Sequence, residues 1–189
     1  DAATRGLSTA MVEARDIASG TSSRSSKLFH GGLRYLEQMD FSLVREALKE
    51  RDLALTRLAP HLVRPVSFLY PLTRHGWERG YVGAGLALYD AMGGSRALPR
   101  HRHLTRRGAR ALAPALRADA LVGGIRYYDA QCDDARYTLT VARTAAAYGA
   151  IIRPSTEVVG FVREGGRIVG AELRYTETGE SSTVRVGVV

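Results

Sequence analysis

Residues 18–37 read ASGTSSRSSKLFHGGLRYLE and decide the predicted fold, because they join a hydroxyl-rich loop to a glycine pair. The loop at residues 19–26 offers many hydroxyl and backbone N–H groups, which can bind a pyrophosphate or a ribityl chain. Taken alone, such a loop is more often an ordinary Ser-rich turn. Its interpretation therefore depends on the residues on either side of it.

The segment that follows, KLFHGGLRYLE at residues 27–37, carries a histidine, a glycine pair and an arginine. The glycine pair allows the backbone to approach a flat ligand closely. His30 and Arg34 are four residues apart, so a helix here would place them on one face. Arginine suits a phosphate or carboxylate, and histidine exchanges a proton near neutral pH. The alternatives are a structural histidine and a surface ion pair of Arg34 with Glu37 or Asp40.

Before the loop, residues 7–12 (LSTAMV) predict a short strand, and Glu13 follows it directly. In nucleotide-binding βαβ units, an acidic residue at the end of the second strand accepts hydrogen bonds from a ribose diol. The first strand and the Gly-rich turn of such a unit would precede Asp1, so we expect the chain to be a piece of a larger protein. A glutamate at a strand end is otherwise usually just solvated.

The rest of the chain alternates helix and strand signals. Periodicity and end signals predict helices at residues 43–58 (capped by Ser42), 81–92 (ended by Gly93 and Gly94), 106–116 and 134–148. Extended runs predict strands at residues 64–72, 124–130, 150–152 (buried), 157–163, 167–176 and 183–189. Residues 95–110 are expected to be an Arg-rich surface loop. Together these elements predict an α/β fold that ends in a β-meander.

The composition is that of a folded globular protein, with 45% hydrophobic and 24% charged residues among 189. These values exclude a disordered, collagen-like or disulfide-rich chain. No apolar run approaches the roughly 20 residues that span a bilayer. The single cysteine, Cys132, permits neither an internal disulfide nor a cysteine-based zinc site. No metal-ligand spacing is present, so we expect no metal.

The net charge of +8 allows a second class of function, a basic nucleic-acid-binding module. Residues 100–110 (RHRHLTRRGAR) are its best evidence. All but two of the 27 basic residues, Lys27 and Lys49, are arginines, which indicates a compositional bias. We therefore favour a solvated basic loop and expect no nucleic-acid partner.

Three segments together resemble the FAD-dependent (quinone-linked) glycerol-3-phosphate dehydrogenases. They are DAATRG at residues 1–6, VEARD at residues 12–16 and the whole run at residues 18–37. Weaker similarity continues through residues 59–62, 89–90 and 133–136. The third segment is the most specific, and the resemblance covers most of the chain.

The resemblance implies a glutathione-reductase-like FAD-binding domain of the amino-acid-oxidase branch, of which residues 1–189 form a truncated part. It implies the cofactor FAD and oxidation of sn-glycerol 3-phosphate to dihydroxyacetone phosphate, with electrons passed to a membrane quinone. A cytoplasmic location follows, with peripheral contact to the cytoplasmic membrane face, and a homodimer is left open. The chain alone is expected to be inactive. A glycerol-3-phosphate oxidase and an amino-acid-oxidase-like flavoenzyme remain alternatives.

The resemblance also assigns roles to individual residues. Glu13 corresponds to the ribose-binding acid, and Val158 lies where main-chain groups hold adenine. The remaining cofactor contacts follow the chain from the pyrophosphate to the flavin ring: Thr21, Ser22, Ser26, Lys27, Leu28, Gly31, Gly32 and Leu33. His30 is assigned as proton acceptor and Arg34 as the anchor of the substrate phosphate, with Tyr35 beside it in the substrate site.

Overall fold

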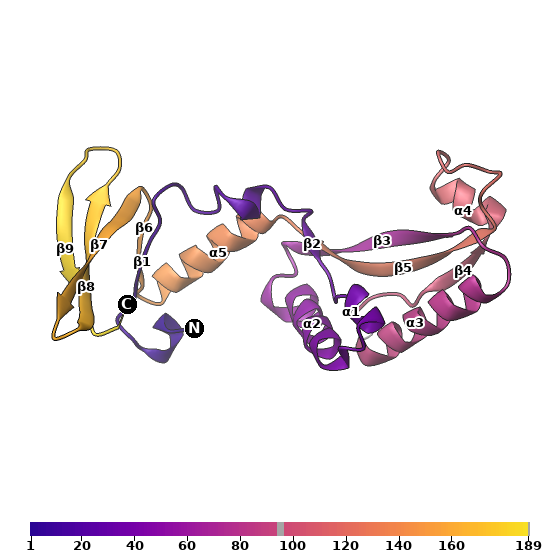
Figure 1. Ribbon diagram of the computed structural model, residues 1–189, viewed down its shortest axis with the longest axis horizontal. Coiled ribbons are helices and arrows are strands. Elements are labelled where there is room, and N and C mark those ends of the chain that lie inside the picture. The colour runs from indigo at the N-terminus through magenta and orange to yellow at the C-terminus, as the bar shows by residue number, and fades with distance from the viewer. Residues whose placement is uncertain (94–96, 189) are drawn as a thin grey trace. The chain divides into compact units, whose positions relative to one another are not determined.

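The computed structural model describes residues 1–93 and 97–188, apart from the side chain of Arg34 (Figure 1). The chain folds into two compact units. We call Ser26–Asp133 the inserted unit, because it interrupts the sequence of the other one. The split unit consists of Asp1–Ser25 and Asp134–Val189. Among the described residues, no helix has the length and apolar character needed to cross a membrane.

The inserted unit is built on an antiparallel sheet whose central strand is β5 (Gly123–Cys132). The long strand β3 (Val63–Leu72) pairs with β5 along its whole length. The other edge of β5 pairs with the short strands β2 (Leu28–Phe29) and β4 (Arg102–Thr105). Strand β5 is therefore bonded on both edges, and several of its residues are buried.

Helices cover one face of this sheet (Figure 1). They are α1 (Arg34–Glu37), α2 (Phe41–Leu53) with a π-helical end at Ala54–Leu58, and α3 (Trp77–Gly93). A further short helix, α4 (Arg106–Leu112), follows β4.

Two clusters of buried apolar side chains form the core of the inserted unit. The first joins α2 to α3 through Val44, Leu48 and Tyr89. The second joins α3 to the sheet through Leu72, Leu86 and Ile125. Leu33 packs against both clusters, so the segment that precedes α1 is anchored where the two meet.

The split unit contains a parallel strand pair and an antiparallel meander. Strand β1 (Ala10–Val12) pairs with β6 (Ile151–Arg153), which follows the helix α5 (Asp134–Ala147). Short 3-10 turns lie at Ala3–Arg5 and Thr21–Ser23. The meander is β7 (Thr156–Glu164), β8 (Arg167–Tyr175) and β9 (Ser181–Arg185).

The strands predicted at residues 157–163 and 167–176 are joined by a tight turn at the Gly165–Gly166 pair. Both glycines adopt left-handed backbone angles, with φ of 52° and 80°, which the tight turn between β7 and β8 requires. Gly179, which lies between β8 and β9, also has a left-handed φ, of 79°.

Several sequence predictions are wrong in detail. The cap of α2 is Asp40 rather than Ser42, because the Asp40 carboxylate accepts the Leu43 N–H at 3.1 Å. Strand β4 lies inside the predicted loop at residues 95–110, and α4 ends at Leu112 rather than 116. Residues 94–96, which include the predicted helix end at Gly94, lie outside the described part of the chain.

The predicted burial of the strand at residues 150–152 is also wrong. Ala150 is buried, but it precedes β6, and Ile151 is 56% exposed.

Candidate active site

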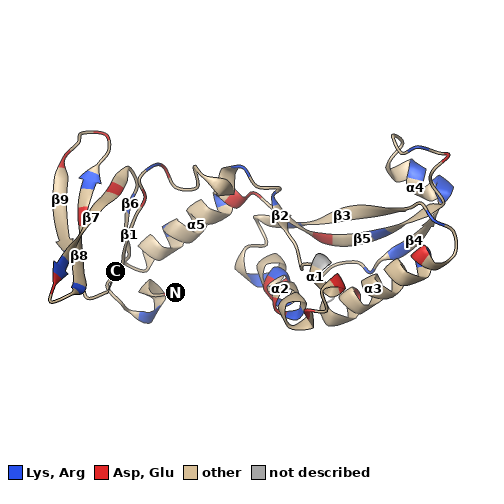
Figure 2. Cartoon of the chain, viewed as in Figure 1, with Lys and Arg blue, Asp and Glu red and all other residues tan. Residues whose placement is uncertain are grey.

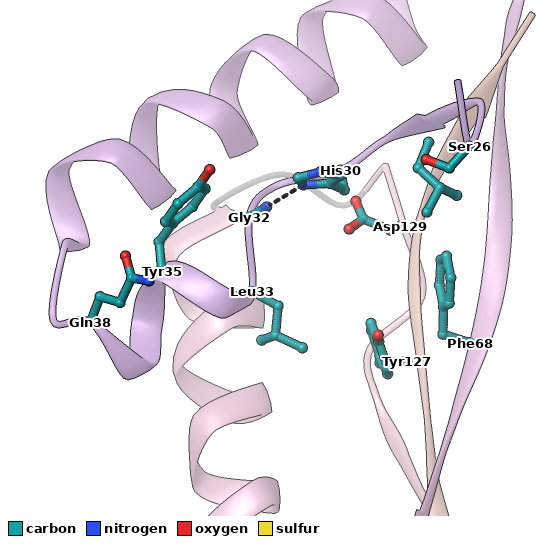
Figure 3. A pocket seen from close by; sticks show the side chains of 10 residues that line it. Ser26, His30, Gly32, Leu33, Tyr35, Gln38, Phe68, Tyr127 and Asp129 are labelled. Atoms are coloured by element: carbon teal, nitrogen blue, oxygen red, sulfur yellow. Dashed lines mark hydrogen bonds between the residues drawn. The ribbon is translucent and has the colours of Figure 1, made fainter. Parts of the chain in front are cut away.

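A pocket of about 660 Å³ opens in the inserted unit where the sequence places the flavin ring (Figure 3). Its residues come from β2, from the segment leading into α1, and from the paired strands β3 and β5. They are Ser26, Leu28, His30, Gly32, Leu33, Tyr35, Gln38, Phe68, Tyr127 and Asp129. Six of the ten are residues to which the sequence assigned a role.

The backbone around His30 is extended rather than helical, so the prediction that a helix places His30 and Arg34 on one face is wrong. Gly32 adopts a left-handed φ of 76°, and α1 begins only at Arg34. The turn is closed by a hydrogen bond of 3.1 Å, in which the Gly32 N–H donates to Nδ1 of His30 (Figure 3). With Nδ1 as acceptor, the proton of the neutral imidazole lies on Nε2. His30 is therefore a hydrogen-bond donor in this arrangement.

Two aromatic rings form one wall of the pocket. Phe68 on β3 lies opposite Tyr127 on β5, and their ring centroids are 5.3 Å apart in a stacked arrangement. Burial, and then the charge of nearby Asp129, raise the pKa of the Tyr127 hydroxyl above its usual value. The hydroxyl consequently stays neutral at physiological pH.

Gly31 lies behind the pocket, in a space that accepts no side chain. A Cβ atom at this position would come within 2.2 Å of Cδ2 of Leu48 and 2.4 Å of the Tyr89 hydroxyl. The backbone of Gly31 is thus packed directly on the core cluster of α2 and α3. Such a glycine lets the neighbouring peptide groups face a ligand while their other side is fully supported.

The remaining residues of this stretch do not all face the pocket. Tyr35, on α1, lines the pocket and is 36% exposed. The backbone of Arg34 begins α1, but its side chain lies outside the described part of the chain. Lys27 lies just before β2 with a φ of 60°, and its Nζ is 4.0 Å from Oδ2 of Asp133. A left-handed lysine is strained, and strain of this kind is concentrated at functional sites.

Glu13 lies in the split unit, directly after the parallel strand β1. Its backbone N–H donates to the Arg153 carbonyl, and its own carbonyl accepts the N–H of Thr156 at 2.8 Å. One carboxylate oxygen accepts the N–H of Arg15 at 3.1 Å, and the side chain is exposed. The structure therefore presents the Glu13 carboxylate at the carboxyl end of a parallel strand, where such folds bind nucleotides.

The other predicted residues of the split unit lie on elements that contact this strand pair or α5. Thr21 and Ser22 form the 3-10 turn, which α5 holds through a 3.3 Å hydrogen bond from Thr138 to the Ser22 hydroxyl. Val158 lies on β7, two residues after the hydrogen bond between Thr156 and Glu13. An irregularity in the ladder between Val158 and Gly160 interrupts the pairing there. The predicted residues thus form two groups, one in each unit.

Sequence reasoning missed four residues of the pocket: Gln38, Phe68, Tyr127 and Asp129. Three of them lie on the paired strands β3 and β5, far from residues 18–37 in the sequence. Asp129 carries a signal that could have found it, since it is a carboxylate between the aromatic pair Tyr127–Tyr128 and Ala130 in a predicted strand. A buried carboxylate needs hydrogen-bond or ion-pair partners, and such a group of polar residues is a candidate for a functional site.

The pocket fits one end of a flavin cofactor. Its volume lies within the range of small-molecule sites, and it combines aromatic and aliphatic walls with a few polar groups. The described residues contain no group of three or more His, Cys, Asp or Glu side chains that could hold a metal ion.

Comparison with known proteins identifies the family. The model of the family DAO, FAD dependent oxidoreductase, matches residues 1–189. The chain is 62% identical to a glycerol-3-phosphate dehydrogenase of Mycobacterium leprae over 189 residues, which are all of this chain and 32% of that protein. It is 43% identical over 202 residues to the mitochondrial glycerol-3-phosphate dehydrogenase of Rattus norvegicus, covering 28% of that protein.

A solved structure agrees with these matches. The glycerol-3-phosphate dehydrogenase of Bacillus halodurans, complexed with FAD, is similar with a TM-score of 0.69 at 28% identity. The similarity covers 98% of this chain and 29% of that one. This chain thus spans about a third of the length of its relatives.

These matches confirm the predicted α/β fold class and FAD as the cofactor of the family. One family model spans both units, while their assignment to a single FAD-binding domain stays a prediction. From the geometry of the pocket and the match over its full length, the chain belongs to the FAD dependent oxidoreductase family.

Proposed function

We propose that this protein oxidises sn-glycerol 3-phosphate to dihydroxyacetone phosphate, using FAD. The observation that carries the proposal is the 62% identity to a protein named glycerol-3-phosphate dehydrogenase, over a match that includes every pocket residue. The pocket supports it, since it is large enough for a flavin edge and a three-carbon substrate.

In this proposal, different described residues bind different parts of the cofactor. Glu13 is the acceptor for a ribose diol, Thr21 and Ser22 serve the pyrophosphate, and the main chain near Val158 serves adenine. Ser26, Lys27 and Leu28 border the flavin edge, and Gly31, Gly32 and Leu33 offer their backbone to the ring. When bound, FAD supplies the acceptor for the hydride that leaves C2 of the substrate.

His30, Arg34 and Tyr35 act on the substrate in this proposal. Arg34 binds the phosphate, because a guanidinium forms two parallel hydrogen bonds with it. His30 holds a substrate oxygen through its Nε2–H for as long as Gly32 donates to Nδ1. To accept the hydroxyl proton at Nε2, the imidazole must first move its own proton to Nδ1, which breaks the bond to Gly32. Tyr35 completes the substrate side of the pocket.

The proposal is tested by mixing the flavin-loaded full-length protein with substrates under anaerobic conditions, because residues 1–189 alone are expected to be inactive. Glycerol 3-phosphate is expected to bleach the visible flavin absorbance, whereas glycerol at the same concentration leaves it unchanged. Bleaching by glycine or proline instead would favour the amino-acid-oxidase-like alternative. In air, rapid formation of hydrogen peroxide would favour a glycerol-3-phosphate oxidase over a dehydrogenase.

We further propose that a membrane quinone accepts the electrons and that the protein works at the cytoplasmic face of the membrane. Support comes from the exposed arginines of β4 and α4, which gather on one end of the inserted unit (Figure 2). Leu112, at the end of α4, is 49% exposed beside them. Basic residues next to apolar ones suit an anionic lipid surface. A homodimer stays a prediction.

A further inference from the structure

Asp129 is a buried carboxylate of the inserted unit, 3% exposed, and both of its oxygens accept hydrogen bonds. Its Oδ1 accepts a hydrogen bond of 3.1 Å from Nη1 of Arg51, and its Oδ2 accepts one of 3.0 Å from the Tyr89 hydroxyl. The N–H of Gly31 points between the two oxygens, at 3.2 and 3.3 Å. One side chain thus connects α2, α3 and β5 to the backbone beside His30.

The partners of Asp129 are themselves fixed. Arg51 also donates two bonds, of 3.1 and 3.0 Å, to Oδ1 of Asp52. Burial, and then the charge of Asp129, raise the pKa of Tyr89 well above its usual value, so its hydroxyl remains a neutral donor. Three buried charges, one positive and two negative, therefore lie within a single network.

Stability alone is a weak reason for such a network. A buried ion pair is often no more stabilising than apolar side chains of the same size. The network is instead built around a backbone amide, since Gly31 is held by Asp129 at its N–H and by Leu48 and Tyr89 beneath its Cα atom. The residues on both sides of Gly31 line the pocket.

We infer that Asp129, oriented by Arg51 and Tyr89, is a positioning residue that fixes the His30–Gly32 backbone for the flavin and the substrate. The catalytic part of the inference rests on the proposed function. The structural part, the immobilised Gly31 amide, concerns only the residues of this chain and does not depend on that function. Asp129 acts through Gly31, and the hydrogen bond from Gly32 to His30 passes the constraint on to the imidazole.

The test uses Tyr89→Phe and Asp129→Asn in the full-length holoprotein, and in the same full-length protein stripped of flavin. Tyr89→Phe removes one donor to Asp129 and keeps the ring, so it is the variant more certain to fold. Asp129→Asn replaces the charged acceptor of the Gly31 amide by a neutral one, which forms weaker hydrogen bonds. In both variants, hydrogen exchange at the Gly31 amide is expected to be about tenfold faster than in the wild type.

If the two variants displace the His30–Gly32 backbone, they also change the surroundings of the flavin and the alignment of the substrate. The visible circular dichroism of the bound flavin is expected to shift. Turnover of glycerol 3-phosphate falls about tenfold at saturation, while its KM changes by less than about twofold, because alignment rather than binding is lost.

Val44→Ala is the matched control, because Val44 belongs to the same core cluster as Tyr89 but makes no bond to Asp129. It lowers the melting temperature and leaves the Gly31 exchange rate, flavin spectrum and turnover unchanged. The inference is overturned if Val44→Ala reproduces the changes, or if both test variants exchange Gly31 at the wild-type rate. If the wild type does not oxidise glycerol 3-phosphate, the proposed function fails, yet the exchange and flavin spectra still decide the inference.

Discussion

Arg34 is the residue on which substrate selection depends in the proposed function. Arg34→Lys keeps the positive charge but loses the planar fork that holds a phosphate in one orientation. In the full-length enzyme, the variant is expected to raise the KM for glycerol 3-phosphate and also to lower kcat, since C2 is then misaligned. Steady-state kinetics with both glycerol 3-phosphate and glycerol measure this effect.

Glycerol is the control for Arg34, because it has no phosphate and should be an equally poor substrate for both forms. Flavin content should also stay near normal. A variant that loses its flavin, or one with unchanged kinetics, would make Arg34 a structural ion-pair residue and remove its assigned role.

At the same scale, the resemblance assigned roles only to those pocket residues that lie in one continuous stretch of the sequence. Ser26, Leu28 and Gly32 could be found because their neighbours in the chain are also their neighbours in space. Phe68 and Tyr127 could not, since they meet only through the register of β3 and β5, which places Ser67 opposite Tyr128 and Phe68 opposite Tyr127. Register is set by the hydrophobic pattern and by the turn that joins two strands, and no tight turn joins β3 to β5, because α3, β4 and α4 lie between them.

At the scale of elements, α2 offers a direct test of how its first turn is fixed. Asp40→Ala removes the carboxylate that accepts the Leu43 N–H and is expected to lower the free energy of unfolding by about 1 kcal/mol. Ser42→Ala should change it by less than about 0.5 kcal/mol, because the Ser42 hydroxyl only donates to Asp40. Chemical denaturation measures the free energy of unfolding of both variants. If both lose the same free energy, Asp40 is not the dominant cap, and the prediction of Ser42 as a cap stands.

The elements themselves were predictable where local signals agree with packing. The long strands β3 and β5 were identified from the sequence because both are rich in aromatic and β-branched or other apolar residues. Prolines lie near both ends of β3, and glycines begin β5. Strand β4 was not identified from the sequence. Its arginine and histidine give no strand signal, and the segment is extended because it pairs with β5. β-propensity depends on such context more than helix propensity does.

At the scale of the whole molecule, the net charge of +8 predicts binding to anionic lipid vesicles. Replacing Arg106 and Arg107 by Gln should weaken this binding about thirtyfold, at about 1 kcal/mol for each arginine near the surface. Sedimentation with vesicles that contain phosphatidylserine measures the change.

The matched control for the vesicle experiment is Arg163→Gln with Arg167→Gln, which removes the same charge from the hairpin of β7 and β8. If the two double variants lose the same amount of vesicle binding, the binding reflects net charge alone and not a lipid-binding surface on α4. Tight DNA binding that persists at physiological salt would contradict the lipid assignment and favour the nucleic-acid-binding alternative.

The division of the split unit has a consequence for synthesis on the ribosome. Strand β1 pairs with β6, so Ala10 must wait for Ile151 to be translated. At about 5–20 residues per second, roughly 7–30 s separate the two strands. The inserted unit is complete at Asp133 and can fold during this interval, whereas the edge of β1 that pairs with β6 stays unpaired. The order of the elements therefore allows the inserted unit to fold before the split unit, and it leaves one edge of β1 open to incorrect pairing until β6 is made.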